Sequence, residues 1–145
     1  MNIVENPITN IGHLIPQKFP FVMVDSLVSF SKTEVTSAFT IKKDNLFFLN
    51  NELSEPGLIE NMAQTVALHT GYDFFLKGED APTGYIGSIK KIEIFKLPKV
   101  GEIITTHVNI IQEFLGITLV EIEVYNINKE VIASGQMKTV IANNG

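Results

Sequence analysis

The amino-acid sequence predicts an α+β fold in which a strongly curved antiparallel sheet of five to six strands wraps one long central helix. Two observations predict this fold. Residues 55–76 repeat apolar side chains at helical spacing and are apolar on nearly all sides, so this segment requires burial around most of its circumference. Two strand-like segments precede the helix, and four consecutive strand-like segments follow it.

The residues before the long helix are predicted to form a short helix, two strands and a loop. The short helix spans Ile8 to Ile15, is capped by Thr9 or Asn10, and ends at Pro16. The segments after it are strands over residues 21–30 and 33–41, a polar hairpin turn at 31–32 and a loop over 44–52.

The long helix is predicted to span about Glu55 to Leu76. Ser54 suits the N-cap, and Pro56 is tolerated in the first turn, where the N–H that proline lacks would have no partner anyway. Lys77-Gly78 ends the helix. The later strands are Tyr85–Phe95, Glu102–Phe114, Ile117–Tyr125 and Val131–Ile141, with turns at Gly101 and Gly116 and a hairpin loop over 126–129.

Length and composition indicate one domain over residues 1–145 and exclude several classes of function. The chain is 45% hydrophobic and has no cysteine, so it can form a core but no disulfide or thiolate site. A net charge of -5 without clustered Lys and Arg argues against a nucleic-acid partner. No run has membrane-spanning length and no signal peptide opens the chain, so we expect a cytoplasmic protein without a membrane partner.

Three segments carry a resemblance to a known family. Residues 14–25, LIPQKFPFVMVD, resemble the family's LLPHRYPFLLVD stretch. Residues 47–51 and 56–64, FFLNN and PGLIENMAQ, resemble its FFxGHFPG loop and PGVLxxEAMAQ helix start. Residues 85–102 are similar to its central strand and the turn that follows. The family is the FabZ-type 3-hydroxyacyl-acyl-carrier-protein dehydratases.

The resemblance implies a hotdog fold and an acyl thioester as ligand. The acyl chain would be carried on the phosphopantetheine of an acyl carrier protein or of coenzyme A, with no further cofactor. It also implies a homodimer, or a heterodimer with another hotdog chain, whose sheets combine into ten or more strands. The substrate-binding positions it implies are Phe48, Gly57, Gly87 and Ile89.

Departures from the family bear on catalysis. The family's catalytic histidine aligns with Asn51, whose amide cannot take up a proton near neutral pH. The family's acid, which handles the leaving hydroxyl, aligns with Glu60. Glu60 follows Gly57 by three positions where the family has five, which weakens the assignment of an oxyanion role to the Gly57 amide. The change from PHR to Pro16-Gln17-Lys18 is expected to matter less.

The helix also predicts a groove beside Glu60. Glu60 and Gln64 are four residues apart and share a face, and Ala67 and Gly71 continue that face with small side chains. We place Glu60, Gln64 and the Asn51 position in the catalytic site. A carboxylate near a helix N-terminus is also stabilised by the helix dipole alone, and the ENMAQ match favours the catalytic interpretation over this one.

None of the three histidines is placed to replace the missing one. His69 lies on the far side of the helix from Glu60, because nine residues at about 100° each turn it away. His107 is predicted at the surface of its strand, and His13 near the C-terminus of the short helix, where capping explains it. His13 is the least unsuitable substitute. Three scattered histidines do not form a metal site, so we expect no metal.

Four functions stay open at this point. The first is a dehydratase that uses Glu60 with an unidentified base. The second is a half-catalytic or non-catalytic subunit that pairs with a histidine-bearing hotdog chain, as similar chains of aryl polyene and flexirubin pathways suggest. The third is an acyl thioesterase in which Glu60 is base or nucleophile. The last is a lipid-binding or structural hotdog protein without turnover.

Overall fold

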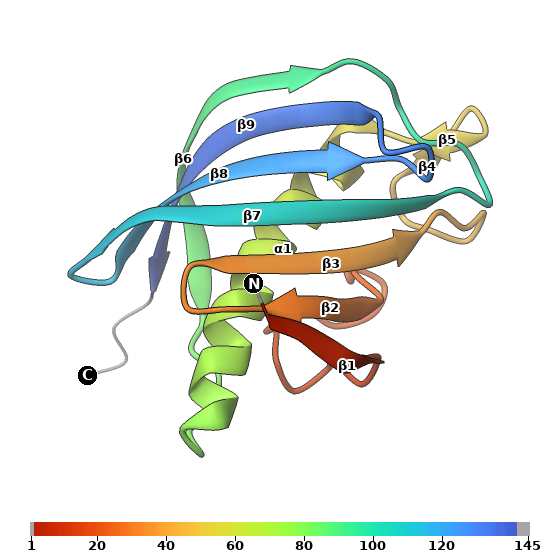
Figure 1. The fold of residues 1–145 in the computed structure, drawn as a ribbon. Coiled ribbons are helices and arrows are strands. Elements are labelled where there is room, and N and C mark those ends of the chain that lie inside the picture. The colour runs from red at the N-terminus through yellow and green to blue at the C-terminus, as the bar shows by residue number, and fades with distance from the viewer. Residues whose placement is uncertain (1, 142–145) are drawn as a thin grey trace.

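The computed structural model describes residues 2–141 and shows one long helix held in a curved antiparallel sheet (Figure 1). The helix, α1, spans Glu55–Leu76, as predicted. The sheet has seven strands, one or two more than expected. In spatial order they are β1 (Asn2–Ile8), β2 (Ser26–Phe30), β3 (Glu34–Thr40), β7 (Ile103–Phe114), β8 (Ile117–Tyr125), β9 (Val131–Ile141) and β6 (Gly84–Ile94).

The predicted N-terminal helix is absent, and an edge strand that was not predicted precedes its position. Asn2–Ile8 pairs with β2 as an edge strand, and no helix forms over Ile8–Ile15. A turn, closed by a hydrogen bond from the Leu14 N–H to the Ile11 carbonyl (2.9 Å), replaces it. Leu14 and Ile15 are buried in this turn, so tertiary burial has overridden the local helical pattern.

The first predicted strand was too long. Regular pairing begins at Ser26 and not at Phe21, because residues 21–25 cross the N-terminal half of α1 and bond to its side chains. The hairpin turn at 31–32 is confirmed, and β2 pairs antiparallel with β3. The loop predicted over 44–52 contains a small hairpin, β4 (Phe48–Leu49) and β5 (Glu52–Leu53).

The second half of the chain agrees closely with the predicted strands. β8 and β9 have the predicted bounds, and β6 and β7 differ from theirs by one residue at one or both ends. Gly101 and Gly116 have φ values of +86° and +78°, the left-handed region that a glycine adopts without strain at a turn. Ser54 is the N-cap of α1, although its side chain makes no capping hydrogen bond.

The core lies between α1 and the concave face of the sheet. Leu58, Met62 and Val66 of α1 are buried against strand residues such as Val108 and Val120. Buried polar residues of α1 face the same layer, which the pattern of a uniformly apolar helix did not predict. The arrangement leaves β6 at the far edge of the sheet, paired only with β9 among residues 2–141.

Candidate active site

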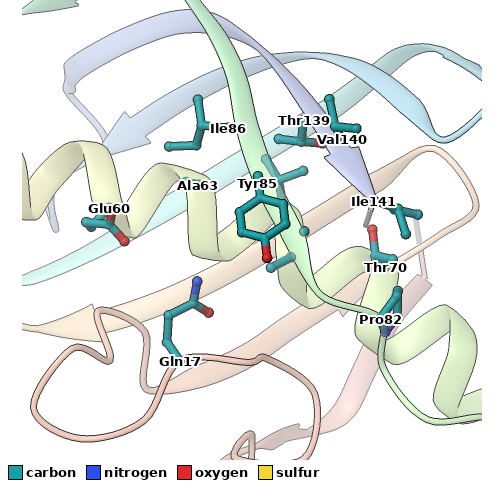
Figure 2. Close-up of a pocket in the computed structure, with 13 residues that line it drawn as sticks. Gln17, Glu60, Ala63, Thr70, Pro82, Tyr85, Ile86, Thr139, Val140 and Ile141 are labelled. Carbon is teal, nitrogen blue, oxygen red and sulfur yellow. The ribbon is translucent and has the colours of Figure 1, made fainter. Parts of the chain in front are cut away.

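A cavity of about 300 Å³ lies between α1 and the ends of β6 and β9 (Figure 2). Its volume is at the lower end of the range for small-molecule sites. One side is the face of α1 that carries Glu60 and the small residues Ala63 and Ala67. The complete lining is Gln17, Glu60, Ala63, Val66, Ala67, Thr70, Pro82, Gly84, Tyr85, Ile86, Thr139, Val140 and Ile141.

Glu60 is the carboxylate of this cavity, and Gln64 fixes its orientation. The Gln64 amide donates from Nε2 to Glu60 Oε2 at 3.1 Å and to the Phe21 carbonyl at 2.8 Å. Its Oε1 accepts the Met23 N–H at 2.7 Å. Because a backbone N–H can only donate, Oε1 must face Met23, and the Nε2 donor is thereby directed at Glu60.

Asn61 makes a second buried connection from the same turn of α1. Its Nδ2 donates to the Met23 carbonyl at 2.7 Å, and its Oδ1 accepts from the Thr106 hydroxyl at 2.5 Å. Together with Gln64 it satisfies both backbone groups of Met23, so Met23 needs no strand partner. The ENMAQ segment therefore holds the preceding loop on α1 and presents Glu60 to the cavity.

Replacing Gln64 with leucine is expected to destabilise the protein by about 2 kcal/mol, because the Met23 N–H would be left buried without a partner and the Phe21 carbonyl would lose its hydrogen bond. Urea denaturation measures the effect. Gln112→Leu is the control, since Gln112 is exposed on β7. An equal and small effect of the two substitutions would contradict the role assigned to Gln64.

Asn51, which aligns with the family's histidine, does not line the cavity. Asn50 and Asn51 have φ values of +54° and +67°, the conformation of a two-residue turn between β4 and β5. Asparagine tolerates this conformation better than most residues, which gives these side chains a local reason to be present. Asn51 is exposed, and its carbonyl accepts the Val100 N–H at 3.0 Å.

The four predicted substrate-binding residues also lie outside the cavity lining. Gly57 is buried under Leu53 and Phe47, where a Cβ would meet their side chains at 2.6 and 2.7 Å. Phe48 packs at the edge of the core. Gly87 occupies a β-bulge of β6, and Ile89 is exposed two residues further on.

Several lining residues were missed by the sequence interpretation. Ala67 lies in the predicted groove, but Gly71 does not, because it packs on the backbone of Leu14. Tyr85 and Ile86 line the cavity in place of Gly87 and Ile89. Gln17 also lines the cavity, from the loop before β2. It belongs to the LIPQKFP match, and that match was the signal that could have found it.

The three histidines all lie among the described residues, and none lines the Glu60 cavity. His69 is buried, bonds the Ser31 carbonyl at 2.8 Å and stacks on Phe30. His107 is only partly exposed, between the Thr36 hydroxyl at 3.0 Å and Glu34 at 3.1 Å. His13 contacts Phe75 edge-on from a turn, so the predicted helix-capping role was wrong.

Among the side chains that the structure describes, those of residues 7–141, no cluster of three or more His, Asp or Glu is arranged to hold a metal ion. Within the same residues, no helix has the length and apolar character needed to cross a membrane.

A curved antiparallel sheet wrapped around one long helix defines the class, and this protein is a hotdog-fold protein. The sequence profile of the ApeP-like family, described as ApeP dehydratase, matches residues 9–144. The chain belongs to this family. The resemblance to dehydratases is therefore confirmed at the level of a dehydratase-like hotdog family. No curated protein sequence matches the chain.

Solved structures of low sequence identity share the fold. The dehydratase heterocomplex ApeI:P from Xenorhabdus doucetiae matches with a TM-score of 0.86 at 18% identity, covering 97% of this chain and 94% of that one. A Streptococcus mutans protein bound to acetyl CoA matches at 0.65 and 13% identity, covering 99% and 94%. A hypothetical thioesterase with coenzyme A from Streptococcus pneumoniae TIGR4 matches at 0.65 and 8%, covering 81% and 84%.

Proposed function

We propose that this chain is a dehydratase subunit that binds a 3-hydroxyacyl thioester and supplies Glu60 to a site whose base comes from a second, histidine-bearing hotdog subunit. The observation that carries the proposal is the content of the cavity. Glu60 is the one carboxylate among the described lining residues, and no histidine accompanies it. The heterocomplex named for the Xenorhabdus doucetiae structure supports the pairing.

The reaction needs an acid and a base on the two sides of the bond that becomes double. A base removes a proton from the carbon next to the thioester carbonyl, and the carbon–oxygen bond at the third carbon breaks. Glu60 gives its proton to the departing hydroxyl, which leaves as water, and the proton held by the base later restores the acid. In the FabZ-type dehydratases that the sequence resembles, the histidine of one protomer works with the acid of the other. A subunit that has only the acid can therefore complete one site with a histidine-bearing partner.

The exposed edge of the sheet supports a partner next to this cavity. Ile89 pairs with the buried residue Met137 and therefore faces the helix side of the sheet, yet it is 45% exposed. Tyr85 and Ile86 on the same strand line the cavity and are also exposed. β6 is a long edge strand with exposed apolar residues in its first half, and an unpaired strand edge is a template for pairing with another chain. A second hotdog chain on β6 would cover these residues and bring its own groups close to Glu60.

Ile89→Glu is expected to weaken association with the partner by about 30-fold or more, since a charge would be buried at a central apolar contact. Analytical ultracentrifugation or titration of labelled subunits measures this. Ile127→Glu is the control, because Ile127 is 72% exposed in the β8–β9 loop. Unchanged association in Ile89→Glu would exclude β6 as the contact edge.

The function is tested by adding 3-hydroxyacyl carrier protein and 3-hydroxyacyl coenzyme A to the chain alone and to the chain with a histidine-bearing hotdog subunit. We expect water loss, followed by mass spectrometry, only in the mixture. The preferred substrate identifies the carrier of the phosphopantetheine arm. If the two chains co-purify but the mixture shows no turnover, the proposal that Glu60 completes a shared site is contradicted. The chain would then be a non-catalytic partner subunit.

An acyl thioesterase is the second candidate, favoured by a cavity with a single carboxylate, which can act alone as base or nucleophile. The coenzyme A complex of the Streptococcus pneumoniae hypothetical thioesterase shares the fold only. Release of free thiol by the chain alone, lost in Glu60→Ala, would replace the dehydratase proposal with this one.

A further inference from the structure

A row of apolar side chains crosses the sheet next to the Glu60 cavity. Phe114 of β7 pairs with Ile117 of β8, and Ile117 pairs with Val140 of β9. Val140 in turn pairs with Tyr85 of β6. Directly opposed residues of antiparallel strands point to the same face of a sheet, so these four side chains form one continuous surface, the apolar row. Phe114, Ile117 and Tyr85 are 66%, 46% and 61% exposed.

The apolar row lies on the outer face of the sheet, away from α1. Thr118 and Val120 of β8 are buried on the helix side, and Ile117 points the other way because successive residues of a strand alternate. At the tip of the β7–β8 hairpin, Leu115 is 84% exposed and has a φ of +52°, a turn position where Gly, Asn or Asp is usual. Neither turn geometry nor contact with water favours a leucine there. Contiguous exposed apolar side chains of this kind mark a binding surface.

The cavity reaches the apolar row around the end of the sheet. Its lining includes the successive residues Thr139 and Val140 of β9 and the successive residues Tyr85 and Ile86 of β6. A cavity confined to the helix side would be lined by alternate residues of these strands. Figure 2 shows Glu60 at one end of the cavity, with the residues of β9 toward the other. Val140 and Tyr85 therefore belong both to the cavity and to the row.

We propose that the apolar row binds the distal part of a long acyl chain whose reactive end lies at Glu60. This inference rests on the proposed function and names the chain-length class of its substrate. A cavity of about 150 Å³ holds a six-carbon ring, so one of about 300 Å³ holds roughly twelve carbons. Further carbons leave the cavity beside Tyr85 and Val140 and continue over Ile117 and Phe114.

The polar groups of the cavity wall are compatible with an aliphatic chain. Thr70 and Thr139 each present a methyl group beside the hydroxyl, and a tyrosine presents an apolar ring face. Between Glu60 and Thr70, the face of α1 that lines the cavity consists of small or apolar residues, Ala63, Val66 and Ala67. The helix thus offers an uncharged path from the carboxylate toward the row.

Two other occupants suit the outer face less well. A partner strand added at the edge of β6 lies in the plane of the sheet, about 4.8 Å from β6, and leaves the outer face open. A second copy packed against this face would meet the exposed carboxylates of Glu121 and Glu123, which share it with Ile117, and would bring the same charges with it. An acyl chain carries no charge and needs only the row.

The test uses phosphopantetheine analogues in which CH₂ replaces the thioester sulfur, so that the chain is not hydrolysed. Calorimetry of the full chain compares the dodecanoyl with the octadecanoyl analogue, each below the concentration at which micelles form. We expect the octadecanoyl analogue to bind about 50-fold more tightly, the gain from six further methylene groups that are about half covered.

The row variant, Phe114→Ser with Ile117→Ser, should reduce this preference to about threefold or less. It should leave dodecanoyl binding unchanged, because neither side chain lines the cavity. The matched control is Ile103→Ser with Ile127→Ser, at residues that are 44% and 72% exposed at the opposite end of β7 and in the β8–β9 loop. The control should keep the full preference, and unchanged dodecanoyl binding shows that both variants are folded.

The outcomes separate this inference from the function on which it rests. Equal binding of the two analogues to the unsubstituted chain overturns the role of the row, as does an equal loss of preference in the row variant and its control. Dimers of the unsubstituted chain that sedimentation detects, and that the row variant abolishes, would make a second copy the occupant and overturn the assignment. If neither analogue binds, the proposed function itself fails.

Discussion

Glu60→Gln will lower the rate of water loss in the two-subunit complex by about 100- to 10,000-fold, the range that a positioned acid contributes. The substitution removes the proton that the departing hydroxyl must receive. It keeps the size of the side chain and an oxygen that can accept the hydrogen bond from Gln64 Nε2. The loss should therefore appear in kcat, with little change in stability or in the affinity of the two subunits.

The matched control for this prediction is Glu55→Gln. Glu55 lies in the first turn of the same helix, is exposed, and does not line the cavity. Its replacement removes the same charge from the same helix, so it should leave the rate within about threefold of the original, because an exposed charge near a helix end contributes little. Comparable losses in the two variants would mean that helix charge, and not proton transfer by Glu60, sets the rate.

Gly71→Ala should cost about 3 kcal/mol of stability, the upper part of the usual range for an overpacked site. A Cβ at Gly71 would lie 1.8 Å from the Leu14 carbonyl oxygen and 2.7 Å from its carbon, and backbone atoms cannot move aside as a side chain can. The better helix propensity of alanine, about 1 kcal/mol, offsets only part of this. Urea denaturation gives the value directly.

Gly12→Ala is the control for this substitution, since a Cβ at Gly12 meets nothing within 4 Å. It should change stability by less than about 1 kcal/mol. If Gly71→Ala were as stable as the unsubstituted chain, the turn that contains Leu14 would not lie on α1, and the entry of Gln17 into the cavity would lose its support.

The parts of the fold that were predictable have strong local signals. Residues 55–76 have a helical period, a cap and a glycine after the end, and α1 has these bounds. β8 alternates between buried and more exposed residues, and a short polar loop joins it to β9. Residues 9–25 could not be predicted in this way, because buried side chains of α1, and not neighbouring residues, supply partners for Met23 and Phe21.

The part of the candidate site that could be predicted consists of residues that align with a family motif. Glu60 and its neighbour Gln64 were found through the ENMAQ match, and the structure joins them by a hydrogen bond. Periodicity on α1 could not reveal that Gln17, Tyr85 and the end of β9 form the opposite walls. Those contacts join segments far apart in the chain, and they depend on the curvature of the sheet, which the strand pattern does not encode.

The most direct test of the half-site is complementation. A histidine-bearing hotdog subunit whose own helix acid has been removed is mixed with this chain, and loss of water from 3-hydroxyacyl carrier protein is measured. Each component alone should be inactive, and the mixture should be active. Glu60→Gln in this chain should abolish the activity of the mixture. An inactive mixture in which the two subunits form a stable complex, or full activity of this chain alone, would contradict the proposal that Glu60 completes a site with a partner's histidine.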